Sequence, residues 1–252
     1  MEEDIFYNNI QKALEDLPGN FNILEEKIDI GVQMKYFEFS RKLRKRSDLE
    51  EYFENREELF SEEAEQKSKK EILAALAAYD DVQAFRTIEK FAKNPDRDLK
   101  DWANLALQES KMLMQSSLLD EQQVFISTGL GGKGQKLRYC VVFINNEQEE
   151  MLNKTQQKLV KDELIFSLKK EEGEFEIISF FEGFSTGLVL LPLSTDLKIL
   201  FHNVIHECNQ YGNFLQEDMI VTNVKDLSRG EIIQLLNEKN EEDNEDLEET
   251  QD

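Results

Sequence analysis

The sequence predicts an α+β protein with an all-helical N-terminal half, an α+β C-terminal half and an acidic tail. Two observations lead to this prediction. Apolar residues recur every three or four positions through the first 120 residues, which is the period of an amphipathic helix. From about residue 121 short β-rich runs alternate with helical stretches. We therefore expect a helical domain over 1–120, an α+β domain over 121–237 and a disordered tail over 238–252.

The predicted helices of the N-terminal half are bounded by residues that cap or break helices. They cover 2–17, 22–45, 65–78 and two stretches within 81–119, with an acidic segment over 49–60. Asp81 can cap its helix, because an N-cap carboxylate accepts hydrogen bonds from the first free amides. Pro95 separates the last two helices, because proline cannot continue a helix.

Residues 70–117 resemble a known class of helical repeat. One helix carries apolar residues three or four apart, and the next contains the small-residue pattern Trp102-Ala103-Asn104-Leu105-Ala106-Leu107. This stretch resembles HEAT-type repeats, in which stacked helical hairpins bury their apolar faces against neighbouring units. The resemblance implies a scaffold that binds a protein partner rather than an active site.

In the C-terminal half the predicted strands cover 124–128, 136–144, 175–181, 187–193 and 219–224, and the predicted helices cover 147–171, 195–211 and 228–236. A glycine-containing turn between the first two strands predicts a hairpin. From Lys136 the order is β-α-β-β-α-β, which is that of a ferredoxin-like sandwich with an extra strand before it and a helix after it. We expect both inner helices on one face of the sheet, leaving the other face free to dock the helical half or a partner.

The chain has 53 acidic and 30 basic residues and a net charge of −23. This surplus argues against nucleic acid and anionic membranes as partners, because affinity for them comes from basic surface. The last fifteen residues hold nine acids and one lysine, so they cannot bury enough apolar surface to fold. The tail is either a solubilising terminus or an arm that inhibits the protein or steers a partner.

The sequence predicts a cytoplasmic location. No apolar run approaches the roughly 20 residues that span a bilayer. The start, Met1-Glu2-Glu3-Asp4, lacks the basic and apolar regions of a secretory signal. Cys140 and Cys208 are too few for a disulfide framework, so we interpret both as reduced core thiols.

A glycine-rich stretch over 127–136 has the spacing G-x-G-x-x-G after a predicted strand. The dinucleotide-binding fingerprint requires a helix next, whose amides hold the pyrophosphate, but a strand pattern follows here. Two interpretations remain: a mobile hairpin loop, or a backbone nest that binds an anion. The residues of the candidate nest are Gly129, Gly131, Gly132, Lys133, Gly134, Lys136 and Arg138.

The only two histidines, His202 and His206, stand four apart on one predicted helix. Residues at i and i+4 share a helix face and could hold one metal ion. They lie opposite the apolar side of that helix, so solvated surface histidines are the other interpretation. No cofactor is predicted.

Residues 41–46 form a basic cluster that could bind phosphates or an acidic partner, or could be a helix end neutralised by nearby acids. No nucleophile elbow or H-E-x-x-H motif is present, which favours a non-enzymatic protein over an enzyme. The sequence therefore predicts a protein-interaction scaffold. The alternative is a regulatory module that binds an anionic small molecule at the Gly129–Gly134 loop. Oligomeric state and partner identity stay open.

Overall fold

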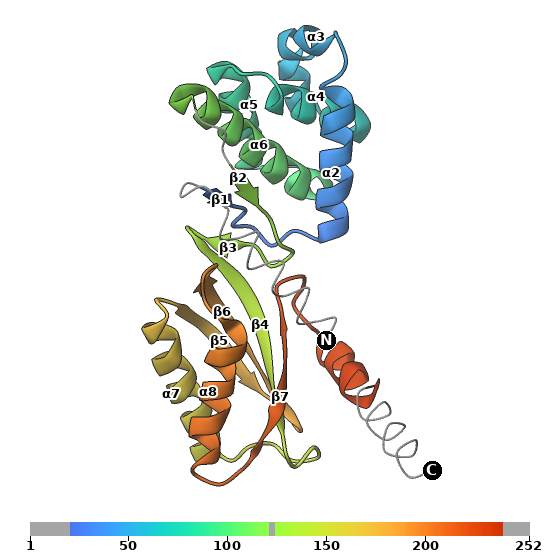
Figure 1. The fold of residues 1–252 in the computed structure, drawn as a ribbon. Helices are drawn as coiled ribbons and strands as arrows, with labels where there is room; N and C mark the ends of the chain where they lie inside the picture. Colours follow the sequence, from blue (N-terminus) through green and yellow to red (C-terminus); the bar gives the residue numbers. More distant parts are fainter. Residues whose placement is uncertain (1–20, 121–123, 239–252) are drawn as a thin grey trace, which may run out of the picture.

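The chain forms a helical half and a sheet half, joined by a pair of short strands (Figure 1). The computed structural model describes residues 21–120 and 124–238. The helix predicted over 2–17 and the tail after residue 238 lie outside the described residues. A search of the described ranges for a helix with the length and hydropathy of a membrane span finds none.

Among the described residues, the helices of the N-terminal half begin and end close to the predicted positions, except that the helix predicted over 22–45 begins only at Ile30. They are α2 (Ile30–Leu43), α3 (Leu49–Glu54), α4 (Gln66–Ala77), α5 (Val82–Ala92) and α6 (Lys100–Leu119), with 3-10 turns at Arg56–Phe60 and Arg97–Leu99. The Asp81 carboxylate caps α5 as predicted, accepting from the amide of Gln83 at 2.6 Å. Asp29 caps α2 in the same way, accepting from the amide of Val32 at 3.1 Å.

Helix α4 lies at the centre of the helical half. Residues 72–77 are each at most 3% exposed, and α4 contacts α2, α3, α5 and α6. This second half of α4 is apolar on all sides, and such a stretch of helix belongs inside a core, since no face of it is left for solvent. Trp102 of α6 closes one end, with its ring edge-on to Tyr36 and its Nε1 donating to the Lys70 carbonyl at 3.2 Å.

The segment before α2 is extended, so the helix predicted over 22–45 is wrong at its start. Strand β1 (Phe21–Ile23) pairs in parallel with β2 (Val124–Ile126). Ile23 packs into the core of the sheet half and Leu24 into the core of the helical half. Successive side chains of an extended chain point to opposite sides, and here each side meets a different core. The apolar spacing that resembled a helix face has this cause.

The sheet half is a curled antiparallel sheet interleaved with helices (Figure 1). Its elements are β3 (Gly132–Lys133), β4 (Lys136–Asn145), α7 (Lys154–Lys170), β5 (Glu174–Phe180), β6 (Phe184–Pro192), α8 (Leu197–Asn209) and β7 (Leu215–Thr222). Strand β4 pairs with β3, β6 and β7, and β6 pairs with β5. Because β2 pairs with β1, the predicted hairpin between 124–128 and 136–144 is wrong. The helix predicted over 147–171 starts later, because Asn153 and Gln156 form a capping box before α7.

The two faces of the sheet carry separate apolar clusters. Helices α7 and α8 cover one face, where Phe143 of β4 packs against Phe201 of α8. On the other face a helix over 229–238 packs Ile232 against Val142 and Phe184. This helix begins where the sequence predicts, after Ser228, whose hydroxyl caps it by accepting from the Glu231 amide at 3.3 Å. The chain therefore covers part of the face that the sequence predicts to be free.

Candidate functional site

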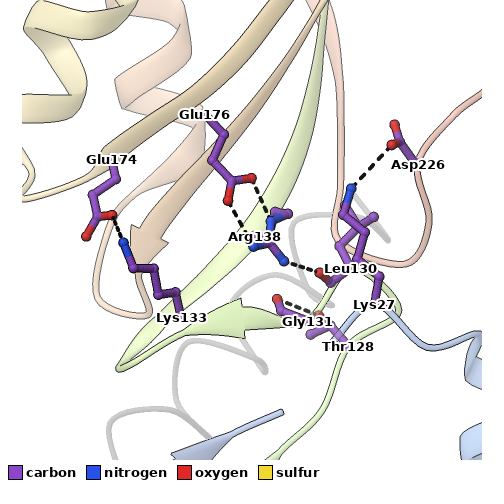
Figure 2. Close-up of polar contacts among 9 residues, drawn as sticks. All are labelled: Lys27, Thr128, Leu130, Gly131, Lys133, Arg138, Glu174, Glu176 and Asp226. Carbon is purple, nitrogen blue, oxygen red and sulfur yellow. Dashed lines mark hydrogen bonds and ion pairs between the residues drawn. The ribbon is translucent and has the colours of Figure 1, made fainter. Parts of the chain in front are cut away.

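The glycine-rich loop lies where the two halves meet, packed against the segments that follow β1 and β7 (Figure 2). A Cβ on Gly129 would lie 1.6 Å from the carbonyl oxygen of Val224. A Cβ on Gly131, whose φ is +66°, would lie 2.5 Å from the carbonyl oxygens of Glu25 and Glu26. Glycine is required at these two positions because neighbouring backbone approaches too closely for any side chain.

Backbone amides of this loop already have acceptors within the chain. The Gly132 amide donates to the carbonyl of Glu25 at 3.3 Å, and the Gly134 amide donates to the Glu25 carboxylate at 2.9 Å. The Leu130 amide donates to the carbonyl of Asn223 at 3.0 Å. An anion-binding nest presents its amides to a free concavity. These amides instead join the loop to the helical half and to the end of β7.

The three cations of the predicted nest bind carboxylates of β5. Figure 2 shows two of these pairs, Lys133–Glu174 and Arg138–Glu176. Lys133 and Lys136 bind Glu174 at 2.8 and 2.9 Å, and these two ammonium groups lower the pKa of Glu174 to about 2. Arg138 donates two hydrogen bonds to Glu176, at 2.6 and 2.9 Å. The structure thus brings the seven predicted residues together, with their cations neutralised by the neighbouring strand.

The basic cluster over 41–46, at the end of α2, is also largely neutralised. Three of its five cations bind carboxylates, in the pairs Lys42–Glu38, Arg44–Glu109 and Arg46–Asp48. Arg41 and Lys45 have no acidic partner in the described part of the chain. The helix end resembles the self-neutralised alternative more than an open phosphate site.

Glu109 is the centre of a polar cluster between α2 and α6. Its carboxylate accepts hydrogen bonds from the hydroxyls of Tyr36 (2.5 Å) and Ser40 (2.8 Å) and binds Arg44. The Glu109 side chain is only 10% exposed, and Tyr36 is fully buried. Burial, followed by the charge of Glu109, raises the pKa of Tyr36 well above its usual value. The cluster fixes α2 against α6.

His202 and His206 lie on the outer side of α8, as predicted. They line a groove of about 460 Å³, together with Glu217 of β7 and several asparagines. The Nδ1 of His202 is 2.9 Å from the carbonyl oxygen of Lys198. Among the described residues, no three His, Cys, Asp or Glu side chains are grouped closely enough to enclose a metal ion.

Helix α7 carries a row of lysines that the sequence analysis did not single out. The α7 row consists of Lys154, Lys158, Lys161 and Lys169. At 100° per residue these four lie within about 80° of one another around the helix axis and extend along about 22 Å of it. All four are exposed, and none has an acidic partner within the described ranges. Their spacing of i, i+4, i+7 and i+15 is the sequence signal that could have identified them.

The α7 row lies on the flank of α7 that Lys161 shares with the edge strand β5. The Lys161 ammonium is 5.5 Å from the ring centre of Phe175 on β5. On the other flank of α7, the charged residues that line a groove shared with α8 are four acids and one lysine: Glu163, Glu171, Asp196, Glu207 and Lys170. Asp162 is the acidic residue of α7 next to the row. Helix α7 therefore separates a cationic flank from an acidic one.

Comparison with known proteins finds no family model and no curated protein that matches this chain. Solved structures match part of it. A candidate transposase from Deinococcus radiodurans R1 has 13% identity and a TM-score of 0.37, over 42% of this chain and 93% of that chain. A REP-associated tyrosine transposase, solved bound to a REP hairpin, has 10% identity and a TM-score of 0.32. That match covers 37% of this chain and 59% of the transposase.

These matches correct the resemblance drawn from residues 70–117. The solved structures that share part of the fold are transposases, so the predicted relation to HEAT-type repeats is wrong. The packing gives the physical reason, because the second half of α4 is buried among α2, α3, α5 and α6, whereas a helix of a stacked repeat contacts only its neighbours.

The expected function is corrected by the same matches. The sequence predicts a non-enzymatic scaffold with a protein partner, or a module that binds an anionic small molecule at the Gly129–Gly134 loop, and argues against nucleic acid. The structural matches to transposases, one of them bound to a hairpin, contradict these expectations.

Proposed function

We propose that this protein binds nucleic acid and that the α7 row contacts the phosphates of its backbone. The observation that carries the proposal is the row itself: four exposed lysines on one face of one helix, without acidic partners in the described part of the chain. Lysines that neutralise phosphates release condensed counterions, which drives the binding of a polyanion. In a chain with a net charge of −23, such a surface is where a polyanion meets the least repulsion.

The shape of the row favours a polymer over a small anion. A small anion is held by donors that converge on one point, whereas these lysines follow a line along the helix. Lys154 and Lys158 are about 6 Å apart along the axis, and Lys158 and Lys161 about 4.5 Å. Phosphates of one duplex strand follow one another roughly every 3.4 Å along the duplex axis. A strand lying along α7 would therefore meet a lysine every one or two phosphates from Lys154 to Lys161, and Lys169 would follow about 12 Å further on, three to four phosphates later.

The experiment is fluorescence anisotropy with a labelled 20-nucleotide single strand and the matching duplex. The variant changes all four lysines to glutamine: Lys154→Gln, Lys158→Gln, Lys161→Gln and Lys169→Gln. We expect it to bind about tenfold more weakly or worse at 50 mM salt. Four phosphate contacts predict a slope of log K against log salt of about −3 for single strands and −4 for duplex, which the variant should largely lose.

The matched control removes the same charge from the helical half. It carries Lys35→Gln, Lys67→Gln, Lys100→Gln and Lys111→Gln, four exposed lysines without acidic partners in the described ranges. This control should retain most of the wild-type affinity. Equal losses in both variants, or no binding by the wild-type protein at low salt, would reject the α7 row as the contact surface.

We also propose that the sheet half is a ferredoxin-like sandwich, that a domain boundary lies near residue 120, and that the protein is cytoplasmic. The strand neighbours β7-β4-β6-β5 and the order β4-α7-β5-β6-α8-β7 support a ferredoxin-like sandwich. Two separate apolar cores support a domain boundary near residue 120. Cys140 and Cys208 are buried free thiols, as expected in the reducing cytoplasm.

A further inference from the structure

Helix α8 carries both histidines of the chain on its outer side. We propose that His202 and His206 hold one divalent transition-metal ion, Zn²⁺ or Ni²⁺, in the groove between α8 and β7. The proposal does not depend on nucleic-acid binding, because the groove lies on α8 and the lysines lie on the far flank of α7.

The spacing of the two rings suits one ion. Residues four apart on a helix have Cβ atoms about 5–6 Å from each other, and a zinc ion binds imidazole nitrogens at about 2.0–2.1 Å. Both rings line the same groove, which is open to solvent and so gives an ion a path to them.

The hydrogen bond of His202 selects the tautomer that a metal needs. Its Nδ1 is 2.9 Å from the carbonyl oxygen of Lys198. A carbonyl can only accept, so Nδ1 carries the proton and the lone pair of Nε2 is free. Histidines that bind metals commonly donate their second ring nitrogen to a carbonyl or carboxylate in this way, which fixes the orientation of the ring.

Asn209, at the end of α8, lines the same groove and ties the helix to β7. Its side chain accepts from the amides of Phe214 (3.1 Å) and Leu215 (3.0 Å) and donates to the Leu215 carbonyl at 2.8 Å. These three bonds hold the start of β7 against α8. Glu217 follows on β7 and adds its carboxylate to the same groove, where it favours a cation.

The ion would keep open coordination positions, because no third side chain of the described residues is grouped with the rings to enclose it. Water fills such positions. Imidazole ligands suit zinc, nickel and copper, whereas magnesium and calcium prefer oxygen ligands. The site should therefore discriminate between these two classes of ion.

The test is a long-range ¹H–¹⁵N NMR titration of the full chain, which has only two imidazole rings to observe. With Zn²⁺, we expect the Nε2 signal of His202 and a ring nitrogen of His206 to shift together and to saturate at one equivalent. The same concentration of Mg²⁺ should leave both rings unchanged. Rings that stay unchanged while calorimetry detects zinc bound elsewhere, or only one ring responding, would overturn the proposal.

Variants give a second readout by calorimetry. His206→Ala should weaken zinc binding about tenfold or more, because a single imidazole remains. Asn203→Ala is the matched control, since Asn203 lines the same groove without offering an imidazole. It should bind zinc like the wild-type chain, and equal losses in the two variants would place the ion elsewhere.

Discussion

The glycine-rich loop and helix α7 both present several cations, but only those of the loop are neutralised. Lys133, Lys136 and Arg138 bind Glu174 and Glu176. The four lysines of the α7 row have no acidic partner in the described residues. The region that looks more like a binding motif in the sequence is therefore the one whose charges are already used.

Strand β5 accounts for this difference, since it borders both regions. Side chains alternate between the two faces of a strand. Glu174 and Glu176 point to the face that carries the loop cations, and Phe175, between them, points to α7 and lies under the Lys161 ammonium. One edge strand thus supplies acids to one group of cations and an aromatic ring to the other. Which cations are free is decided by the register of β5, not by the local sequence around the cations.

The largest expected effect is on the loop. Gly129→Ala would place a Cβ 1.6 Å from the Val224 carbonyl oxygen, so backbone must move at the junction of the two halves. We expect the free energy of unfolding to fall by at least about 3 kcal/mol, measured by urea denaturation. Gly134→Ala is the control, because its Cβ would meet nothing within 4 Å and only its positive φ adds a cost, of about 1–2 kcal/mol. Equal losses would mean that the loop is not held by close packing.

The next largest loss of stability is expected at Glu109, a buried acid that is paired with Arg44. Glu109→Ala removes the acceptor of the Tyr36 and Ser40 hydroxyls and the partner of Arg44. We expect a loss of about 3 kcal/mol in urea denaturation, because buried donors are left without acceptors. Tyr36→Phe removes one of these bonds and should cost about 1 kcal/mol. If Tyr36→Phe costs as much in Glu109→Ala as in the wild-type chain, the two side chains are not coupled.

Some helix starts could be predicted from the sequence, because a side-chain cap is a local interaction, but the caps of α2 at Asp29 and of α7 at Asn153 were missed. Asp81 and Ser228 begin helices at the predicted positions. The segment from Phe21 to Asp29 was not predictable, since its apolar spacing fits a helix face as well as an extended chain between two cores. The partner of β2 could not be predicted either, because it is β1, about 100 residues earlier in the chain.

The candidate site also has a part that could be predicted from the sequence and a part that could not. The seven loop residues are neighbours in the sequence, so their proximity was predictable. Their acidic partners lie about 40 residues away on β5, and only the register of the sheet brings them there. The spacing of the α7 lysines can be read from the sequence, but the lack of acidic partners depends on the fold.

Freeing the loop cations from their ion pairs would test whether any group of unpaired cations on this protein can bind a polyanion. Glu174→Gln with Glu176→Gln frees Lys133, Lys136 and Arg138. If nucleic acid binds as proposed, its affinity at 50 mM salt should rise by about twofold to tenfold, measured by anisotropy. Glu147→Gln with Glu149→Gln removes the same charge from exposed positions and frees no cation. A gain as large in this control would show that net charge, not release of the cations, causes the effect.

The smallest effect is on the titration of Glu174. Lys133, and then Lys136, lowers its pKa from 4.5 to about 2. Because the folded-state pKa is lowered, the pairing stabilises the protein above pH 4.5, and this contribution is lost as the pH falls through about 2. Its size is small since the carboxylate is exposed. In a ¹³C carboxyl NMR titration, Lys133→Gln should raise the pKa of Glu174 toward its ordinary value. Lys154→Gln should leave it unchanged, because the α7 row lies on the opposite side of β5. An equal shift in both variants would mean that the two groups of cations share one electrostatic field, and the distinction between them would be lost.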